Sequence, residues 1–80
     1  MNIKSPAELQ AAIDNPTEEN IIAISTYKWY NFYCNLYIKE GTKEHKENEN
    51  IFSILQKENP ELHKRIEESV DVLIERLQYD

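Results

Sequence analysis

Glycine is nearly absent from this chain of 80 residues, since Gly41 is the only one. All-β folds need many tight turns, and those turns usually take glycine at positive φ. The scarcity therefore argues against a sandwich or a barrel and favours helices joined by a few short loops. A chain of this length is enough for one domain and too short for two. We expect residues 1–80 to form a single small helical domain.

Cysteine is equally scarce, and Cys34 alone can supply no intrachain disulfide and no zinc quartet. The first residues lack the apolar stretch of a signal peptide. No run approaches the roughly 18 apolar residues of a membrane span. We therefore expect a cytoplasmic protein in a reducing compartment, without a membrane partner, in which Cys34 is a small buried apolar residue.

Basic residues are outnumbered, with 9 Lys and Arg against 15 Asp and Glu, which gives a net charge of −6. An acidic chain repels the phosphate backbone and anionic membrane surfaces, so nucleic-acid binding is not expected. The acidic charge does not exclude binding to a basic protein. The composition is rich in Glu, Lys, Ile and Asn, whose codons are rich in A and T. This bias predicts an origin in an AT-rich bacterium, or in a phage or mobile element within one.

Groups for catalysis or metal binding are few. A nucleophile needs a neighbouring base, and Cys34 is far in sequence from both His45 and His63. Zinc needs three or four ligands at close spacing, and each histidine has only glutamates nearby. We expect both histidines to be solvated on charged faces. No glycine-rich turn could hold a phosphate. We therefore predict a protein that is not an enzyme and that takes no cofactor and no metal.

The first two helix starts are clearly marked. Ser5-Pro6-Ala7-Glu8 is a capping box with proline at the first helical position. Asn15-Pro16 ends that helix, because a residue before proline avoids the α region. Thr17 can cap a second helix. No Gly or Pro interrupts residues 20–39, and Gly41 suits a helix C-terminus, so we expect this central helix to reach Lys39.

The second half of the chain predicts two further helical segments. Residues 41–50 form a polar connection, which we expect to be a mobile solvated loop or an extra exposed turn of helix. Asn50 can cap a short helix, and Asn59-Pro60 begins a last helix that runs nearly to the end. A single long helix kinked at Pro60 is an alternative. The apolar stripe of the last helix has helical spacing: Leu62, Ile66, Val70, Leu73 and Leu77.

Aromatic residues are concentrated in residues 27–37, which hold six of the eight in the chain. On a helix they would cover more than one face, and a core this thin cannot shelter them all. Tyrosine and tryptophan are enriched at protein interfaces. The competing interpretation is a central bundle helix whose tyrosine hydroxyls reach water. We predict the following partner-binding residues: Trp29, Tyr30, Phe32, Tyr33 and Tyr37.

A strand is the rival interpretation of this segment. Apolar residues alternate with others from Tyr30 to Ile38, which is typical of a half-buried strand. This would give an α+β fold with residues 21–38 as strands. However, no turn residues separate residues 21–25 from Tyr30, so no hairpin is indicated. The favoured fold is therefore an all-α bundle of three or four helices, with residues 20–39 as its central element.

These observations lead to one main functional hypothesis, a non-enzymatic protein-binding module. It would be a small regulator or inhibitor of phage or mobile-element type that binds another protein, such as a host protein, through its aromatic helix face. One alternative is a structural protein that forms a homodimer. Another is a small DNA-binding regulator that uses the polar stripe Lys28, Asn31, Asn35 and Lys39. A DNA mimic is also conceivable, although lysines interrupt the acidic residues.

Overall fold

The computed structural model describes residues 3–34 and 38–79. It is a small bundle of four α-helices, and no strand occurs within these two ranges. The helices are α1 (Pro6–Asp14), α2 (Glu18–Lys28), α3 (Lys43–Glu58) and α4 (Pro60–Tyr79). One π-helical turn, η1 (Trp29–Tyr33), extends α2. The predicted all-α bundle is confirmed, and the alternative with strands is wrong because residues 21–33 are helical.

The first two helices begin where their capping hydroxyls predict. Ser5 Oγ accepts a hydrogen bond from the amide of Glu8 at 3.3 Å. Thr17 Oγ1 does the same for the amide of Asn20 at 3.1 Å. Each hydroxyl satisfies an amide that has no partner within its own helix. Both predicted N-termini are therefore confirmed.

The central helix is shorter than predicted, because it ends with η1 at Tyr33 instead of at Lys39. The amide of Cys34 donates to the carbonyl of Trp29 at 3.2 Å, which is the π-helical spacing. Asn31 explains the ending. It is fully buried, and its Oδ1 accepts a hydrogen bond from the amide of Ile38 at 3.0 Å. This bond brings the chain back against the helix, and residues 35–37 between them lie outside the described ranges.

Of the two expectations for the polar connection, the helical one agrees with the structure, although the helix is longer than one extra turn. Gly41, with φ of 87°, lies in a turn in which the Thr42 amide donates to the Lys39 carbonyl at 3.3 Å. Thr42 Oγ1 then accepts from the amide of His45 at 3.3 Å. Thr42 is thus the N-cap of α3, which begins at Lys43 and not after Asn50. The solvated-loop interpretation of residues 43–50 is wrong.

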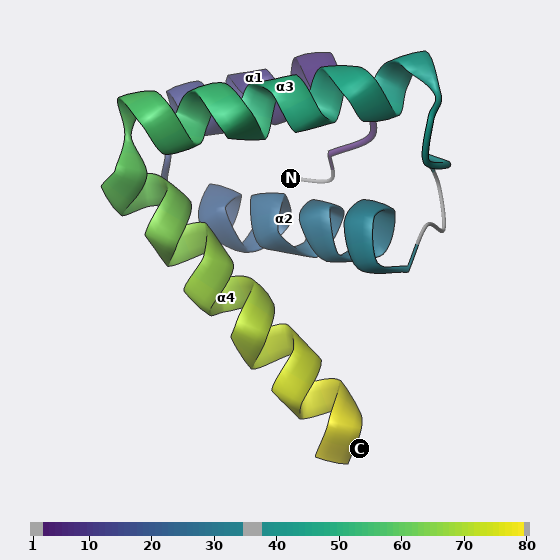
Figure 1. Ribbon diagram of the computed structural model, residues 1–80. Coiled ribbons are helices and arrows are strands. Elements are labelled where there is room, and N and C mark those ends of the chain that lie inside the picture. Colours follow the sequence, from purple (N-terminus) through teal and green to yellow (C-terminus); the bar gives the residue numbers. More distant parts are fainter. Residues whose placement is uncertain (1–2, 35–37, 80) are drawn as a thin grey trace.

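The helices are arranged around one core (Figure 1). α1 and α3 lie side by side, α2 runs below them, and α4 turns away at Asn59 so that its C-terminal end extends beyond the others. Asn59 Oδ1 accepts from the amide of Leu62 at 3.3 Å and starts α4 in its new direction. The alternative of one kinked helix is therefore wrong.

The hydrophobic core takes buried side chains from all four helices. The predicted stripe of α4 is confirmed where it can be followed: Leu62, Ile66 and Val70 are buried, and Leu73 is half-buried. The side chain of Leu77 lies outside the described part of the structure. The remaining core residues are Leu9, Ala12, Ile21, Ile24, Tyr27, Phe52 and Leu55.

A small polar residue sits where α2 and α4 meet. Ser25 is fully buried, and its Oγ lies 2.7 Å from the carbonyl oxygen of Ile21 and 3.4 Å from that of Ile66. Because the serine side chain is small, the two helices can approach closely here. Its buried hydroxyl lies near backbone carbonyls, so no polar group is left without a hydrogen-bond partner. The contact fixes the middle of α4 against α2.

A second polar contact lies inside the bundle, between Tyr27 and Asn48. The Tyr27 hydroxyl donates to Asn48 Oδ1 at 3.0 Å, and both side chains are buried. Asn48 Nδ2 is buried without a hydrogen-bond partner among the described residues. Burial raises the pKa of the Tyr27 hydroxyl, and the carboxylates of Glu8 and Glu44 raise it further.

We expect Tyr27→Phe to lower the free energy of unfolding by about 1–2 kcal/mol at pH 7, because Asn48 Oδ1 is left buried and unpaired. The double variant Tyr27→Phe/Asn48→Leu replaces both polar groups by apolar groups of similar shape and should recover most of the loss. Urea unfolding measures both values. A double variant less stable than Tyr27→Phe would contradict this account.

The same pair predicts a dependence on alkaline pH. The stabilisation from protonated Tyr27 is fully present below its ordinary pKa of 10.0 and is lost as the pH rises through the higher pKa of the folded state. Phenylalanine cannot titrate. The stability difference between the native chain and Tyr27→Phe should therefore shrink above about pH 10.

Candidate protein-binding surface

The aromatic segment divides between the inside and the outside of the bundle. Tyr27 belongs to the core, whereas Trp29, Tyr30 and Phe32 are half-buried. Tyr33 is the most open of them, with 54% of its surface exposed. Tyr37 lies outside the described residues. The predicted helix thus carries aromatic side chains on more than one face, and only part of that surface is covered.

Phe32 contacts the bundle. Its ring centroid lies 5.0 Å from the ring of His45 and 5.6 Å from that of Phe52, the second in an edge-to-face arrangement. Such pairs contribute beyond the apolar area that they bury. Of the predicted partner-binding residues, Phe32 therefore has the clearest structural role.

Trp29 and Tyr30 are half-buried neighbours whose rings contact one another. Their ring centroids are 4.9 Å apart with the planes tilted by 56°. Trp29 packs against the hydrophobic core. Tyr30 faces another way and lines a groove beside α2 with a volume of about 620 Å³. Both rings are half-buried, so part of each remains open to solvent.

The Tyr33 hydroxyl is influenced by charges on α4. Partial burial raises the pKa of its hydroxyl, and the nearby carboxylates of Glu67 and Asp71 raise it further. Glu67 and Asp71 are one helical turn apart and therefore share a side of α4. We name the surface formed by Trp29, Tyr33, Glu67 and Asp71 the η1–α4 surface. It combines an exposed ring with carboxylates.

The groove beside α2 is lined mainly by apolar side chains. Ile3 and Ile38 are among the residues that border it. Ile22, which is 58% exposed, lies along it. The principal apolar and aromatic residues that line it are Ile3, Ile22, Ala23, Tyr30 and Ile38.

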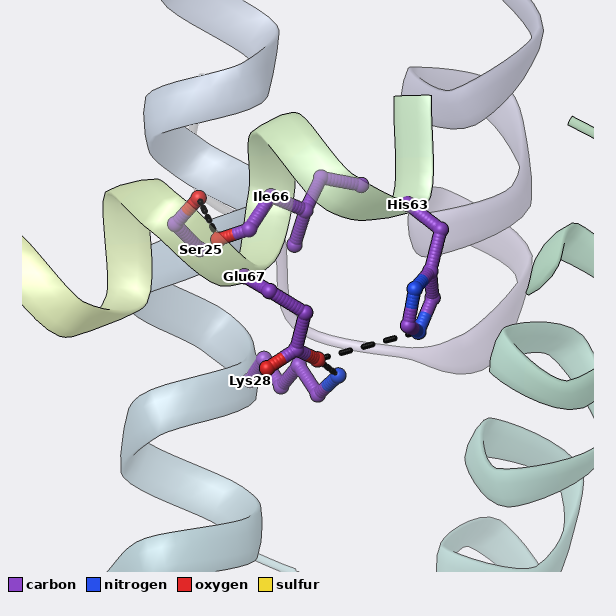
Figure 2. Close-up of polar contacts among 5 residues, drawn as sticks. All are labelled: Ser25, Lys28, His63, Ile66 and Glu67. Atoms are coloured by element: carbon purple, nitrogen blue, oxygen red, sulfur yellow. Dashed lines mark hydrogen bonds and ion pairs between the residues drawn. The ribbon is translucent and has the colours of Figure 1, made fainter. Parts of the chain in front are cut away.

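A charged cluster joins α2 to α4 at the edge of the η1–α4 surface (Figure 2). Glu67 accepts a hydrogen bond from Lys28 Nζ and lies 3.7 Å from His63 Nε2. Lys28 Nζ also lies 4.7 Å from the centroid of the Phe52 ring. Lys28 and the buried Asn31 are thus both engaged inside the bundle. These contacts remove the first half of the polar stripe proposed to read DNA, and Asn35 lies outside the described ranges.

We expect Glu67→Gln to lower the free energy of unfolding by about 1–2 kcal/mol, because Lys28, whose side chain is only 11% exposed, would lose its charged partner. Glu68→Gln is the matched control, since Glu68 is the next residue and is exposed. That variant should stay within about 0.5 kcal/mol of the native chain. Urea unfolding compares the two, and equal losses would contradict the assigned role of Glu67.

The histidines and the cysteine do not lie as expected. His45 is buried, with Nδ1 3.1 Å from Glu49 Oε1, and His63 is half-buried beside Glu67. The prediction that both are solvated is therefore wrong, because α3 begins earlier and carries His45 under Phe32. Cys34 is exposed, which corrects the prediction of a buried thiol. Its position just after η1 places it beyond the helix.

Over residues 3–34 and 38–79 there is no cluster of three or more His, Cys, Asp or Glu side chains able to hold a metal ion. Within these ranges, too, no helix combines the length and apolar character needed to cross a membrane.

Two members of the η1–α4 surface were missed by the sequence reasoning, namely Glu67 and Asp71. Their spacing of one helical turn is visible in the sequence, and it places them together on the last helix. What the sequence could not supply is the packing of α4 against α2, which pairs Glu67 with Lys28.

Comparisons with known proteins give no relative. The chain matches no family model, no curated protein and no solved structure.

Proposed function

We propose that this chain is a non-enzymatic protein-binding module, a small regulator or inhibitor of phage or mobile-element type that binds another protein. The observation that carries the proposal is Tyr33, a large ring that is 54% exposed at the end of a central helix. Trp29 and Tyr30 are half-buried next to it. Aromatic side chains that are already partly held by their own chain lose little conformational freedom on binding.

The second support is the way in which the ring is held. η1 is the C-terminal extension of α2, the helix that packs against both α1 and α4. Trp29 packs on the core and Asn31 bonds the chain on both sides of the turn. A binding residue on a rigid element keeps its geometry better than one on a free loop. Tyr33 is therefore the proposed anchor, with Trp29 and Tyr30 beside it.

Affinity capture from a lysate of the source cell, followed by quantitative mass spectrometry, tests the proposal. The native chain and a Tyr33→Ala variant serve as parallel baits, and Glu58→Gln, an exposed change at the far end of α3, is the control. We expect a protein that the native and control baits retain and that Tyr33→Ala loses. A partner retained equally by all three baits would contradict the assigned surface.

Sedimentation of the purified chain at several concentrations separates this function from the structural homodimer. A strict monomer removes the homodimer. A dimer that Tyr33→Ala dissociates would show that the same surface pairs two copies of this chain, and the binding module would then be set aside.

A further inference from the structure

The groove beside α2 has the size and the shape of a binding site for a long, narrow molecule. It follows one face of the helix, because residues that line it recur every three or four positions, from Glu19 through Ile22 and Thr26 to Tyr30. At the usual rise of a helix this face extends for about 15 Å. The volume of the groove, about 620 Å³, falls within the roughly 300–1,000 Å³ of small-ligand pockets.

The polar residues that line the groove use their hydrogen-bond donors within the chain. Thr26 Oγ1 donates to the carbonyl of Ile22 at 2.9 Å. The hydroxyl of Tyr27 donates inside the bundle. Asn31 Nδ2 donates to the carbonyl of Tyr27 at 2.9 Å, and its Oδ1 accepts from the amide of Ile38 at 3.0 Å. The walls therefore suit an occupant that needs no hydrogen bonds along its length, which is a hydrocarbon chain.

Two charged residues also line the groove, and they differ in their surroundings. Glu19 lies in the first turn of α2, where the positive end of the helix dipole stabilises its carboxylate. Lys4 precedes α1, is exposed, and has no ion pair with any residue of the described ranges. The groove thus joins an apolar lining to one open ammonium group, which can receive an anion.

We propose that the groove binds a free long-chain fatty acid. Its hydrocarbon chain lies along α2 against Ile3, Ile22 and Ile38, and its carboxylate lies at Lys4. Burial of the chain supplies the affinity, because each methylene removed from water contributes to it. The charge at Lys4 sets the orientation of the ligand. This site is separate from the proposed protein-binding anchor, since Tyr33 is not among the residues that line the groove.

Other apolar occupants suit the groove less well. The net charge of −6 opposes contact with an anionic bilayer, whereas a free fatty acid brings a single negative charge. A purely apolar segment of another protein would cover the groove without offering an anion to Lys4, and would remove part of the hydration of that charge. A hydrocarbon chain with a terminal carboxylate meets both features of the site.

Isothermal titration calorimetry of the purified full chain with myristate, below the concentration at which myristate forms micelles, tests the proposal. Ala23→Phe places a ring in the groove, and Ala11→Phe adds the same ring at an exposed position of α1. Lys4→Glu reverses the charge at the groove, and Lys43→Glu makes the same change of net charge at an exposed position of α3. Circular dichroism checks that each variant keeps its helical content.

We expect myristate to bind saturably with one molecule per chain, and laurate, which is two methylenes shorter, to bind about tenfold more weakly. Ala23→Phe should weaken myristate binding at least tenfold, and Ala11→Phe should leave it unchanged. Absence of saturable binding, or equal affinity in these two variants, would overturn the proposal. If Ala23→Phe does not fold, Ile22→Glu replaces it, because Ile22 is 58% exposed and its substitution spares the core.

The role of Lys4 is tested with the uncharged alcohol of the same chain length. Lys4→Glu should weaken myristate about tenfold and leave the affinity for the alcohol within about twofold, whereas Lys43→Glu should change neither. Equal weakening of myristate by the two glutamate variants would show general repulsion only and would contradict a carboxylate at Lys4.

Two further controls separate this site from the alternatives. Vesicles of phosphatidylcholine and phosphatidylglycerol without free fatty acid should not bind the chain, and binding that Ala23→Phe abolishes would assign the groove to a lipid surface instead. Tyr33→Ala should bind myristate like the native chain. A loss in that variant would contradict the separation of the two sites, whereas failure of the proposed protein partner leaves the myristate result unaffected.

Discussion

Replacing Ile66 by alanine should destabilise the bundle by about 3 kcal/mol, the usual cost of emptying a fully buried aliphatic site. Ile66 has no exposed surface, and its own carbonyl faces the buried hydroxyl of Ser25. The cavity would therefore open at the contact between α2 and α4, where the backbones already lie close and cannot collapse further. The lost methyl groups and the remaining void both contribute.

The expected loss from Ile66→Ala is a large share of the total free energy of unfolding. A domain of 80 residues has a total stability of about 4–12 kcal/mol. Urea unfolding should show a markedly lower midpoint for Ile66→Ala with an unchanged slope. Val72→Ala is the control, because Val72 lies on the same helix with 49% of its surface exposed. That variant should differ by less than about 0.5 kcal/mol, and a similar loss in both would contradict the packing described.

Replacing Tyr33 by alanine should weaken partner binding about 30-fold, which corresponds to the roughly 2 kcal/mol of an interface hot spot. Because 54% of the side chain is exposed, the substitution removes little that the bundle itself needs. Folding stability should change far less than affinity. This separation between binding and stability is what distinguishes an interface residue from a core residue.

Tyr33→Phe is the companion variant, since it keeps the ring and removes the hydroxyl. It should retain affinity within about fivefold if stacking on the ring dominates. Isothermal titration calorimetry with the captured partner measures all three forms. Full affinity in Tyr33→Ala, with its helical content intact, would remove Tyr33 from the interface.

The sequence predicted the features that depend on neighbouring residues. The caps at Ser5 and Thr17 act within one turn, so the residue types alone identify them. The buried stripe of Leu62, Ile66 and Val70 follows from helical spacing. These features required no knowledge of how the helices pack.

The features that were missed depend on residues distant in the sequence or on an overlooked cap. η1 ends the central helix because Asn31 holds the amide of Ile38, seven residues on. His45 is buried because Thr42 starts α3 early and Phe32 covers its ring. The Thr42 hydroxyl was visible in the sequence, whereas the contacts of Asn31 and Phe32 appear only once the chain is folded.

The candidate surface was predicted in part. The concentration of aromatic residues falls at the C-terminal end of α2, where the structure leaves Tyr33 exposed. Phe32 packs against Phe52, whereas Tyr33 is exposed. Which ring is covered could be known only from the positions of α3 and α4. The same holds for the pairing of Glu67 with Lys28, because the two residues lie on different helices.

Chemical-shift mapping of the isotope-labelled chain on addition of its captured partner tests the central claim most directly. The account predicts the largest shifts at the Trp29 indole, at Tyr33 and around Asp71 of α4. Shifts confined to the outer faces of α1 and α3, with the Tyr33 signals unmoved, would contradict it.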